Sequence, residues 1–161
     1  MIRKLKHADA FQCAALYGQT NLPTWSFDSF QQTLHLPTTC GYGAFSNPNP
    51  NNLNEEGDIL GFILYSSCPP EAEILVFVVS PPWQGQGIGT RLLHHVIDEG
   101  KYEALFLEVS AKNRKAQDFY KKHGFSKIGG RENYYLIDGE PQDAWTFRLS
   151  LSGNYSESPF K

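Results

Sequence analysis

A glycine-rich loop, PPWQGQGIGT at residues 81–90, contains the first residues whose type and spacing could support chemistry. Gly85, Gly87 and Gly89 alternate with larger residues, and glycine lets a ligand approach the backbone closely. An apolar strand pattern precedes the loop and an amphipathic helix pattern follows it, which argues against a flexible linker. The free amides at a helix start attract anions. The run therefore predicts a phosphate or pyrophosphate site, with a tight turn that binds nothing as the alternative.

Two other phosphate-binding motifs do not fit this loop. No Lys-Ser or Lys-Thr pair follows the glycines, which excludes a P-loop. No acidic residue follows a second strand at the distance that the dinucleotide-binding fingerprint requires. The glycine spacing alone does not identify the ligand.

Two further side chains could transfer protons. Glu108 interrupts the apolar strand pattern ALFLEVS, where a carboxylate is costly unless it is paired or faces a cleft. A partly desolvated carboxylate has a raised pKa and suits a general base, whereas a glutamate at a wet strand end has no such role. Tyr120 shares a helix face with Ala116 and Phe119, which is typical of a core aromatic. Its hydroxyl could also donate a proton.

Alternating strands and helices would position these residues. Hydrophobic patterns predict strands over 2–7, 38–46, 58–67, 72–80, 104–110, 126–137 and 143–151. They predict helices over 8–20, 26–36, 88–100 and 113–124. Asn113 is the expected N-cap of the last helix and Gly124 its stop. The strand 104–110 is apolar on both faces and should therefore be central and buried.

Composition limits the classes of protein that this chain can belong to. Its 161 residues are 40% hydrophobic and 14% aromatic, which predicts one packed domain over 1–150 and a flexible tail over 151–161. The net charge of -3 argues against direct binding of nucleic acid but allows a cationic peptide partner. The chain contains no run of 18 consecutive apolar residues, so no membrane span is expected. Three widely spaced cysteines predict reduced thiols, no metal site and a cytoplasmic location.

The segment QGQGIG, residues 84–89, resembles the Q/R-x-x-G-x-G/A motif of the GNAT acetyltransferases. The stretches LPTWSFDSF, AEILVFVVSPPWQGQGIGTRLL, LFLEVSAKNRKAQDFYKKHGF and RENYY are similar to its RimI branch, the ribosomal-protein alanine N-acetyltransferases. The resemblance as a whole extends from about residue 21 to residue 149. The resemblance implies the GNAT fold, an α+β domain in αβα layers. Its mixed, mostly antiparallel sheet splays between the fourth and fifth strands.

The resemblance also implies a binding site for the cosubstrate acetyl-CoA. The implied residues are Phe77, Val78 and Val79 along the pantetheine arm, Gln84, Gly85, Gln86, Gly87, Ile88 and Gly89 at the pyrophosphate, and Asn113. One departure is Gly85, which stands where relatives often carry arginine. The loop then lacks a cation that helps to hold phosphate, and Arg91 on the following helix could replace it.

Roles for the two proton-transfer candidates follow from the same resemblance. Glu108 would remove a proton from the acceptor amine, and Tyr120 would protonate the leaving CoA thiolate. A backbone N–H in strand 74–79, near Val78, would stabilise the tetrahedral intermediate.

Three aromatic residues are candidates for the acceptor side. Trp25 lines it in RimI-like proteins, and the alternative is a hydrophobic anchor for the second helix. Tyr134 and Tyr135 could shape a peptide channel. Neighbouring strand residues face opposite ways, so at most one of the two should line it.

The implied function is direct transfer of acetyl from acetyl-CoA to the N-terminal α-amine of a protein, specifically an N-terminal alanine of a ribosomal protein. An α-amine has a reference pKa of about 7.7–8.0 against about 10.4 for lysine, so a single base deprotonates it more easily. Acetylation of a small amine or of a lysine is an alternative. A non-catalytic acyl-CoA-binding module is another, which retention of both Glu108 and Tyr120 disfavours.

Overall fold

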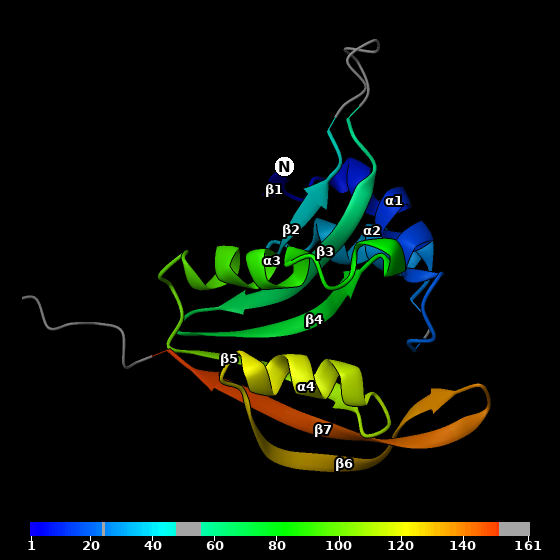
Figure 1. Cartoon of the computed structure of the whole chain (residues 1–161), viewed down its shortest axis with the longest axis vertical. Coiled ribbons are helices and arrows are strands. Elements are labelled where there is room, and N and C mark those ends of the chain that lie inside the picture. The colour runs from blue at the N-terminus through cyan, green and yellow to red at the C-terminus, as the bar shows by residue number, and fades with distance from the viewer. Residues whose placement is uncertain (24, 48–55, 152–161) are drawn as a thin grey trace, which may run out of the picture.

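The computed structural model describes residues 1–23, 25–47 and 56–151. Over these residues the strands form one sheet in the order β1-β2-β3-β4-β5-β7-β6, shown in Figure 1. The strands are β1 (Ile2–Lys4), β2 (Thr39–Phe45), β3 (Ile59–Cys68), β4 (Glu71–Val79), β5 (Ala104–Ser110), β6 (Ser126–Ile137) and β7 (Glu140–Ser150). Neighbours pair antiparallel except β4 and β5, which are parallel. The predicted mixed, mostly antiparallel sheet is confirmed.

Helices cover both faces of this sheet. They are α1 (Ala10–Tyr17), α2 (Phe27–His35), α3 (Ile88–Ile97) and α4 (Arg114–Lys122), with short 3-10 turns at His7–Asp9 and Pro81–Trp83. Apolar residues of α1 and α2 pack into one core with β3 and β4. Those of α3 and α4 pack into a second core on the opposite face, in front of the sheet in Figure 1. The predicted αβα layering is therefore confirmed.

Side-chain caps define where two of the helices begin. The Ser29 amide donates to Ser26 Oγ at 3.1 Å before α2. The Ala116 amide donates to Asn113 Oδ1 at 3.2 Å before α4, and Gly124 beyond its end has φ +90°. The first helix is shorter than the predicted 8–20. It begins as a 3-10 turn, where Asp9 is buried and accepts from the Lys6 amide.

The parallel neighbours β4 and β5 separate from each other along their length. They pair only from Glu71↔Ala104 to Ile74↔Leu107. Beyond that point β4 continues along β3, while β5 continues along β7. Leu75 has no partner in β3 because the register shifts there, and such a bulge bends a strand away from its neighbour. The predicted splay between the fourth and fifth strands is confirmed.

Two other predictions concern the ends and surfaces of the chain. The proposed tail, apart from Leu151, lies outside the described residues. The single domain over 1–150 stays a prediction. Within the described ranges, the structure contains no helix with the length and apolar character needed to cross a membrane.

Candidate active site

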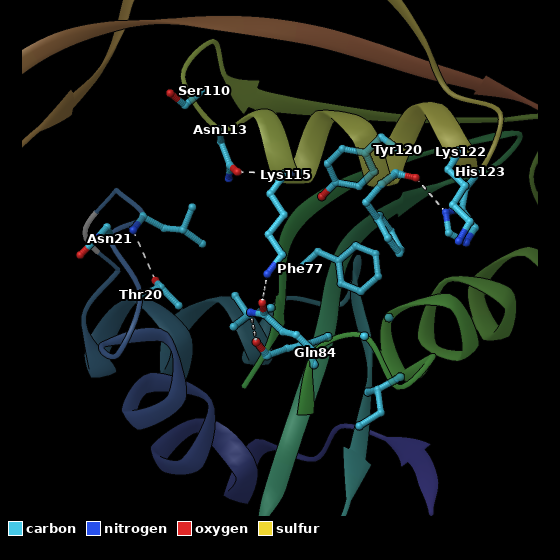
Figure 2. A pocket seen from close by; sticks show the side chains of 18 of the residues that line it. Thr20, Asn21, Phe77, Gln84, Ser110, Asn113, Lys115, Tyr120, Lys122 and His123 are labelled. Carbon is cyan, nitrogen blue, oxygen red and sulfur yellow. Dashed lines mark hydrogen bonds between the residues drawn. The ribbon is translucent and has the colours of Figure 1, made fainter. Parts of the chain in front are cut away.

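A cavity of about 720 Å³ opens where β4 and β5 separate. Its walls are the end of β4, the glycine loop, the start of α3 and one face of α4 (Figure 2). The sequence-predicted cosubstrate residues that line it are Phe77, Val78, Val79, Gln84, Gly85, Gly87, Ile88, Gly89 and Asn113. Gln86 is exposed and does not line it, because its side-chain amide donates to the Pro82 carbonyl at 3.1 Å.

The glycine loop forms an open cradle at the start of α3. Gly85 has φ +76° and Gly87 has φ +79°, a region of backbone conformation that favours glycine. A Cβ added at either position would meet no atom within 4 Å, so the backbone is accessible to a ligand. Gly89 differs, because a Cβ there would lie 3.3 Å from the Phe119 ring. The loop is thus a tight turn and also a cradle with free helix-start amides, which fits a pyrophosphate.

A second, smaller cavity of about 130 Å³ contains Glu108 in its wall. The α1–α2 connection contributes Leu22, Pro23 and Trp25 to the same wall. The residues that line both cavities are Leu22, Phe77, Ser110, Asn113, Ala116 and Tyr120. The two predicted proton-transfer residues are therefore brought together, with Tyr120 at the boundary between the cavities and Glu108 inside the smaller one.

Tyr120 is a core aromatic that also lines both cavities. Its ring is 8% exposed and packs against Phe77, Phe119 and Phe125 at centroid distances of 6.3, 5.6 and 5.4 Å. Figure 2 shows its hydroxyl pointing into the larger cavity. Burial raises the pKa of Tyr120 above its ordinary value, which keeps the hydroxyl protonated and able to donate.

Glu108 lies within β5, opposite Thr146 of β7, and its side chain is 12% exposed. Its Oε1 atom is 2.9 Å from Nε of Arg131, a β6 residue whose side chain is 60% exposed. The Arg131 guanidinium also lies 5.2 Å from the centroid of the Tyr134 ring. The Glu108 charge is the main cause of a raised pKa at Tyr134. Glu108 is therefore a paired carboxylate at a cavity and not a wet strand end.

The three acceptor-side aromatics have different positions. The Trp25 ring packs 5.1 Å from Phe30 of α2, as a hydrophobic anchor for that helix would, and it also lines the smaller cavity. Tyr135 lines the smaller cavity, whereas Tyr134 is 48% exposed and lines neither cavity. Their rings contact each other at 5.0 Å. The β6–β7 register shifts between Arg131 and Tyr135, which disturbs the alternation of side chains there, and one of the two tyrosines lines a cavity.

The ladder between β3 and β4 shows which backbone amides face the opening. The Ser80 amide donates to the Leu60 carbonyl of β3 at 2.8 Å, and Val78 stands opposite Phe62 in the same register. Amides alternate along a strand, so those of Ser80 and Val78 face β3. The amides of Phe77 and Val79 then face the widening gap toward β5. The N–H groups that could serve as the predicted oxyanion donor near Val78 are therefore those of its two neighbours, Phe77 and Val79.

Several lining residues could not be singled out from the sequence. Tyr17 lines the smaller cavity, and its hydroxyl donates to the Pro23 carbonyl, but its apolar helical spacing is that of a core residue. Ser110 lines both cavities and donates to Gln142 Oε1 at 2.6 Å. Arg91, the expected replacement for a loop arginine, is exposed and does not line the larger cavity.

The larger cavity has the chemistry of an anion site. Lysine side chains reach it from α4 and its N-terminal connection, whereas the glycine loop contributes amides alone. Among the described residues, no group of three or more histidines, cysteines, aspartates or glutamates could hold a metal ion.

Comparison with known proteins identifies the class that this fold and site define. Residues 11–125 match the model of the Acetyltransferase (GNAT) family. The chain belongs to this family of acetyltransferases.

Individual relatives point to one branch of the family. The chain is 33% identical to the N-alpha-acetyltransferase RimI of Mycobacterium tuberculosis over 153 residues, 91% of this chain and 90% of the relative. It is 34% identical to the [Ribosomal protein bS18]-alanine N-acetyltransferase of Escherichia coli over 103 residues, 62% of this chain and 70% of the relative.

Solved structures agree with this assignment. The crystal structure of the ribosomal-protein-S18-alanine N-acetyltransferase from Escherichia coli superposes with a TM-score of 0.82 and 26% identity, covering 99% of both chains. Arabidopsis thaliana NAA60 in complex with acetyl-CoA shares the fold, with a TM-score of 0.80 and 18% identity over 95% of this chain and 99% of the other. The resemblance to RimI-like GNAT acetyltransferases is confirmed.

Proposed function

We propose that this protein transfers acetyl from acetyl-CoA to the N-terminal α-amine of a protein. The observation that carries the proposal is the joint position of Glu108 and Tyr120. Glu108 is the only charged side chain among the described residues that line the smaller cavity, and Tyr120 stands at its boundary with the larger one. The names of the RimI relatives, which are N-terminal acetyltransferases, support the same reaction.

The larger cavity suits acetyl-CoA as cosubstrate. The free amides of the cradle at Gly85 and Gly87 and the start of α3 would hold the pyrophosphate. Phe77 and Val79 at the open edge of β4, together with Asn113, would hold the pantetheine arm. Acetyl-CoA supplies an acetyl group that is activated as a thioester. The wall shared by the two cavities would bring that group to the acceptor.

Glu108 acts as the general base of the reaction. An α-ammonium group entering the smaller cavity would meet the Glu108 carboxylate, directly or through one water. The carboxylate accepts the proton that the amine must lose before its nitrogen attacks the acetyl carbonyl. Because an α-amine has a pKa near neutrality, one carboxylate is sufficient for this step.

Backbone and phenol donors complete the reaction. The Phe77 amide faces the opening, and Phe77 lines both cavities, so its N–H is the proposed donor to the oxygen of the tetrahedral intermediate. When the intermediate collapses, the carbon–sulfur bond breaks and the thiolate leaves. Tyr120 donates its hydroxyl proton to that sulfur as negative charge develops on it, and the proton stays on Tyr120 until then because burial raises the pKa of the phenol.

The smaller cavity favours a small first residue on the acceptor. Its volume is about 130 Å³, and Tyr17, Trp25 and Tyr135 close its sides. Such a space accepts an amine with a short side chain and excludes a bulky one. This supports an N-terminal alanine, and the Escherichia coli relative suggests a ribosomal protein as its source. The net charge of -3 favours basic residues farther along the peptide.

The test is acetylation of synthetic peptides that differ only in the first residue, read by mass spectrometry. We expect alanine and serine at the first position to be acetylated faster than leucine or phenylalanine. Glu108→Gln keeps the shape of the side chain and should lower the rate by about 10²–10⁴. CoA affinity should be unchanged in this variant. A Glu108→Gln enzyme with the wild-type rate, under conditions where chemistry limits turnover, would remove the assigned base.

A further inference from the structure

The glycine loop carries no charge of its own. Residues 84–89 contain glutamine, glycine and isoleucine alone. Arg91 is the first cation after the loop, but it is exposed and lies outside the wall of the larger cavity. Backbone amides would therefore face a doubly charged diphosphate without a cation from their own segment.

Lys115 of α4 reaches this loop from the opposite wall. Its Nζ atom donates a hydrogen bond to Oε1 of Gln84, the first residue of the loop. Figure 2 shows the side chain extending from α4 across the cavity to Gln84. Gln84 is itself oriented by its Nε2 atom, which donates to the Val79 carbonyl at 2.9 Å. The carbonyl oxygen of its side chain is therefore turned toward α4.

The charge of the larger cavity comes from the α4 side. Lys112, Lys115 and Lys122 line this cavity, and Asp138 is the one carboxylate among its described lining residues. The cavity is thus locally cationic in a chain whose net charge is -3. Of the three lysines, Lys115 has a described hydrogen bond to a loop residue.

We infer that Lys115 supplies the cation that the loop lacks, and that it binds the diphosphate of acetyl-CoA from α4. This inference rests on the proposed function, which places acetyl-CoA in the larger cavity. Lys115 is exposed, so its ammonium can leave the neutral Gln84 oxygen for a phosphate oxygen at little cost. A charge-assisted hydrogen bond to phosphate is stronger than one to an amide. Lys115 on α4 then supplies the positive charge that an arginine in the loop would otherwise supply.

Calorimetric titration with CoA and with 3′-dephospho-CoA tests the inference without measuring activity. Lys115→Met should weaken the binding of both ligands about tenfold, as expected for loss of one charge-assisted hydrogen bond. Lys115→Arg should retain most of the affinity. Lys121→Met is the matched control, because Lys121 is an exposed α4 lysine that does not line the cavity. Its affinity should remain within about twofold of the wild type, since distant surface charges are screened by salt.

The possible outcomes separate this inference from the proposed function. Equal CoA affinity in wild type and a folded Lys115→Met variant would overturn the inference alone. A loss seen with CoA but not with 3′-dephospho-CoA would also overturn it, because Lys115 would then contact the 3′-phosphate. Failure of the wild-type protein to bind either ligand would remove the acetyl-CoA site and the proposed function with it. Lys115→Gln provides a second neutral variant, and thermal unfolding verifies that each variant is folded.

Discussion

Arg131 Nε lies 2.9 Å from Glu108 Oε1, so a cation from the edge strand β6 is paired with the proposed catalytic base. Glu108 lies on β5 and Arg131 lies on β6, and β7 lies between these two strands in the sheet. Glu108 is 12% exposed and Arg131 is 60% exposed, so the ion pair connects the cavity wall to the surface. Arg131 can thus hold the carboxylate in one orientation and can also move away when an acceptor amine arrives.

The first prediction concerns Arg131 as a positioning residue. Arg131→Met should lower kcat about tenfold, because an unpaired Glu108 side chain no longer keeps one orientation toward the acceptor. The KM for the acceptor peptide should not rise, since the guanidinium and the acceptor ammonium are both cations that would pair with this carboxylate. Steady-state kinetics separate the two effects. Glu132→Gln, a change at the exposed neighbour on β6, is the control. A higher KM with unchanged kcat in Arg131→Met would contradict the positioning role.

The second prediction concerns Tyr120 as the proton donor. Tyr120→Phe should lower kcat by about 10²–10⁴ with little change in CoA affinity. Because burial raises the pKa of Tyr120, its neutral form persists above the ordinary tyrosine pKa of about 10. Tyrosinate absorbance of the wild type and of the variant should therefore coincide as the pH rises to 10. If the wild type develops a tyrosinate signal below pH 10 and Tyr120→Phe lacks that signal, then Tyr120 is not a protonated donor.

The third prediction concerns the cradle at Gly87. Its φ of +79° disfavours a branched side chain, and the free space above it is where the diphosphate would approach. Gly87→Val should weaken CoA binding at least tenfold, which corresponds to about 1.4 kcal/mol. Gly129→Val on β6 is the control, because a Cβ there also meets nothing within 4 Å and no positive φ is involved. Wild-type CoA affinity in a folded Gly87→Val protein would remove the phosphate site.

The fourth prediction links the core to the acceptor side. Phe30 is fully buried and packs against Tyr17, Trp25 and Phe62 at centroid distances of 5.5, 5.1 and 5.7 Å. Phe30→Ala should lower the free energy of unfolding by about 3–5 kcal/mol, measured by urea denaturation. Two residues that line the smaller cavity, Tyr17 and Trp25, would lose their packing partner, so the KM for the acceptor should rise more than that for acetyl-CoA.

A matched aromatic gives the comparison for this fourth prediction. Phe11 is 71% exposed on α1, and Phe11→Ala should change the free energy of unfolding by less than about 0.5 kcal/mol. Equal destabilisation by the two substitutions would mean that Phe30 does not anchor the second helix.

Local patterns were sufficient for much of the fold and for part of the site. Ser26 and Asn113 are polar caps before apolar periodic segments, and both cap helices in the structure. Gly85 and Gly87 form the tight turn before a helix that their spacing indicates, with positive φ values that glycine permits. These features depend on residues near one another in the sequence, where propensity and hydrogen bonding act directly.

Features that arise from strand register were not predictable in this way. The pairing of Arg131 with Glu108 requires three strands to be aligned, and the bulge before Tyr135 changes which side chains share a face. The bulge at Leu75 likewise depends on the register in which β4 pairs with β3. The contact of Lys115 with the glycine loop joins α4 to a segment about thirty residues earlier in the chain, and no local pattern marks it.

The central claim is that the acceptor is a protein N-terminal α-amine, and one paired measurement tests it most directly. Two basic peptides of the same sequence, each beginning with alanine and containing one internal lysine, are incubated with enzyme and acetyl-CoA. In one the N-terminus is free, and in the other it is blocked. Mass spectrometry with fragmentation locates the acetyl group, and Glu108→Gln gives the background rate. We predict rapid acetylation of the free alanine and a rate near background for the blocked peptide. Faster acetylation of the blocked peptide, at its lysine, would contradict the proposed function and favour a lysine acetyltransferase.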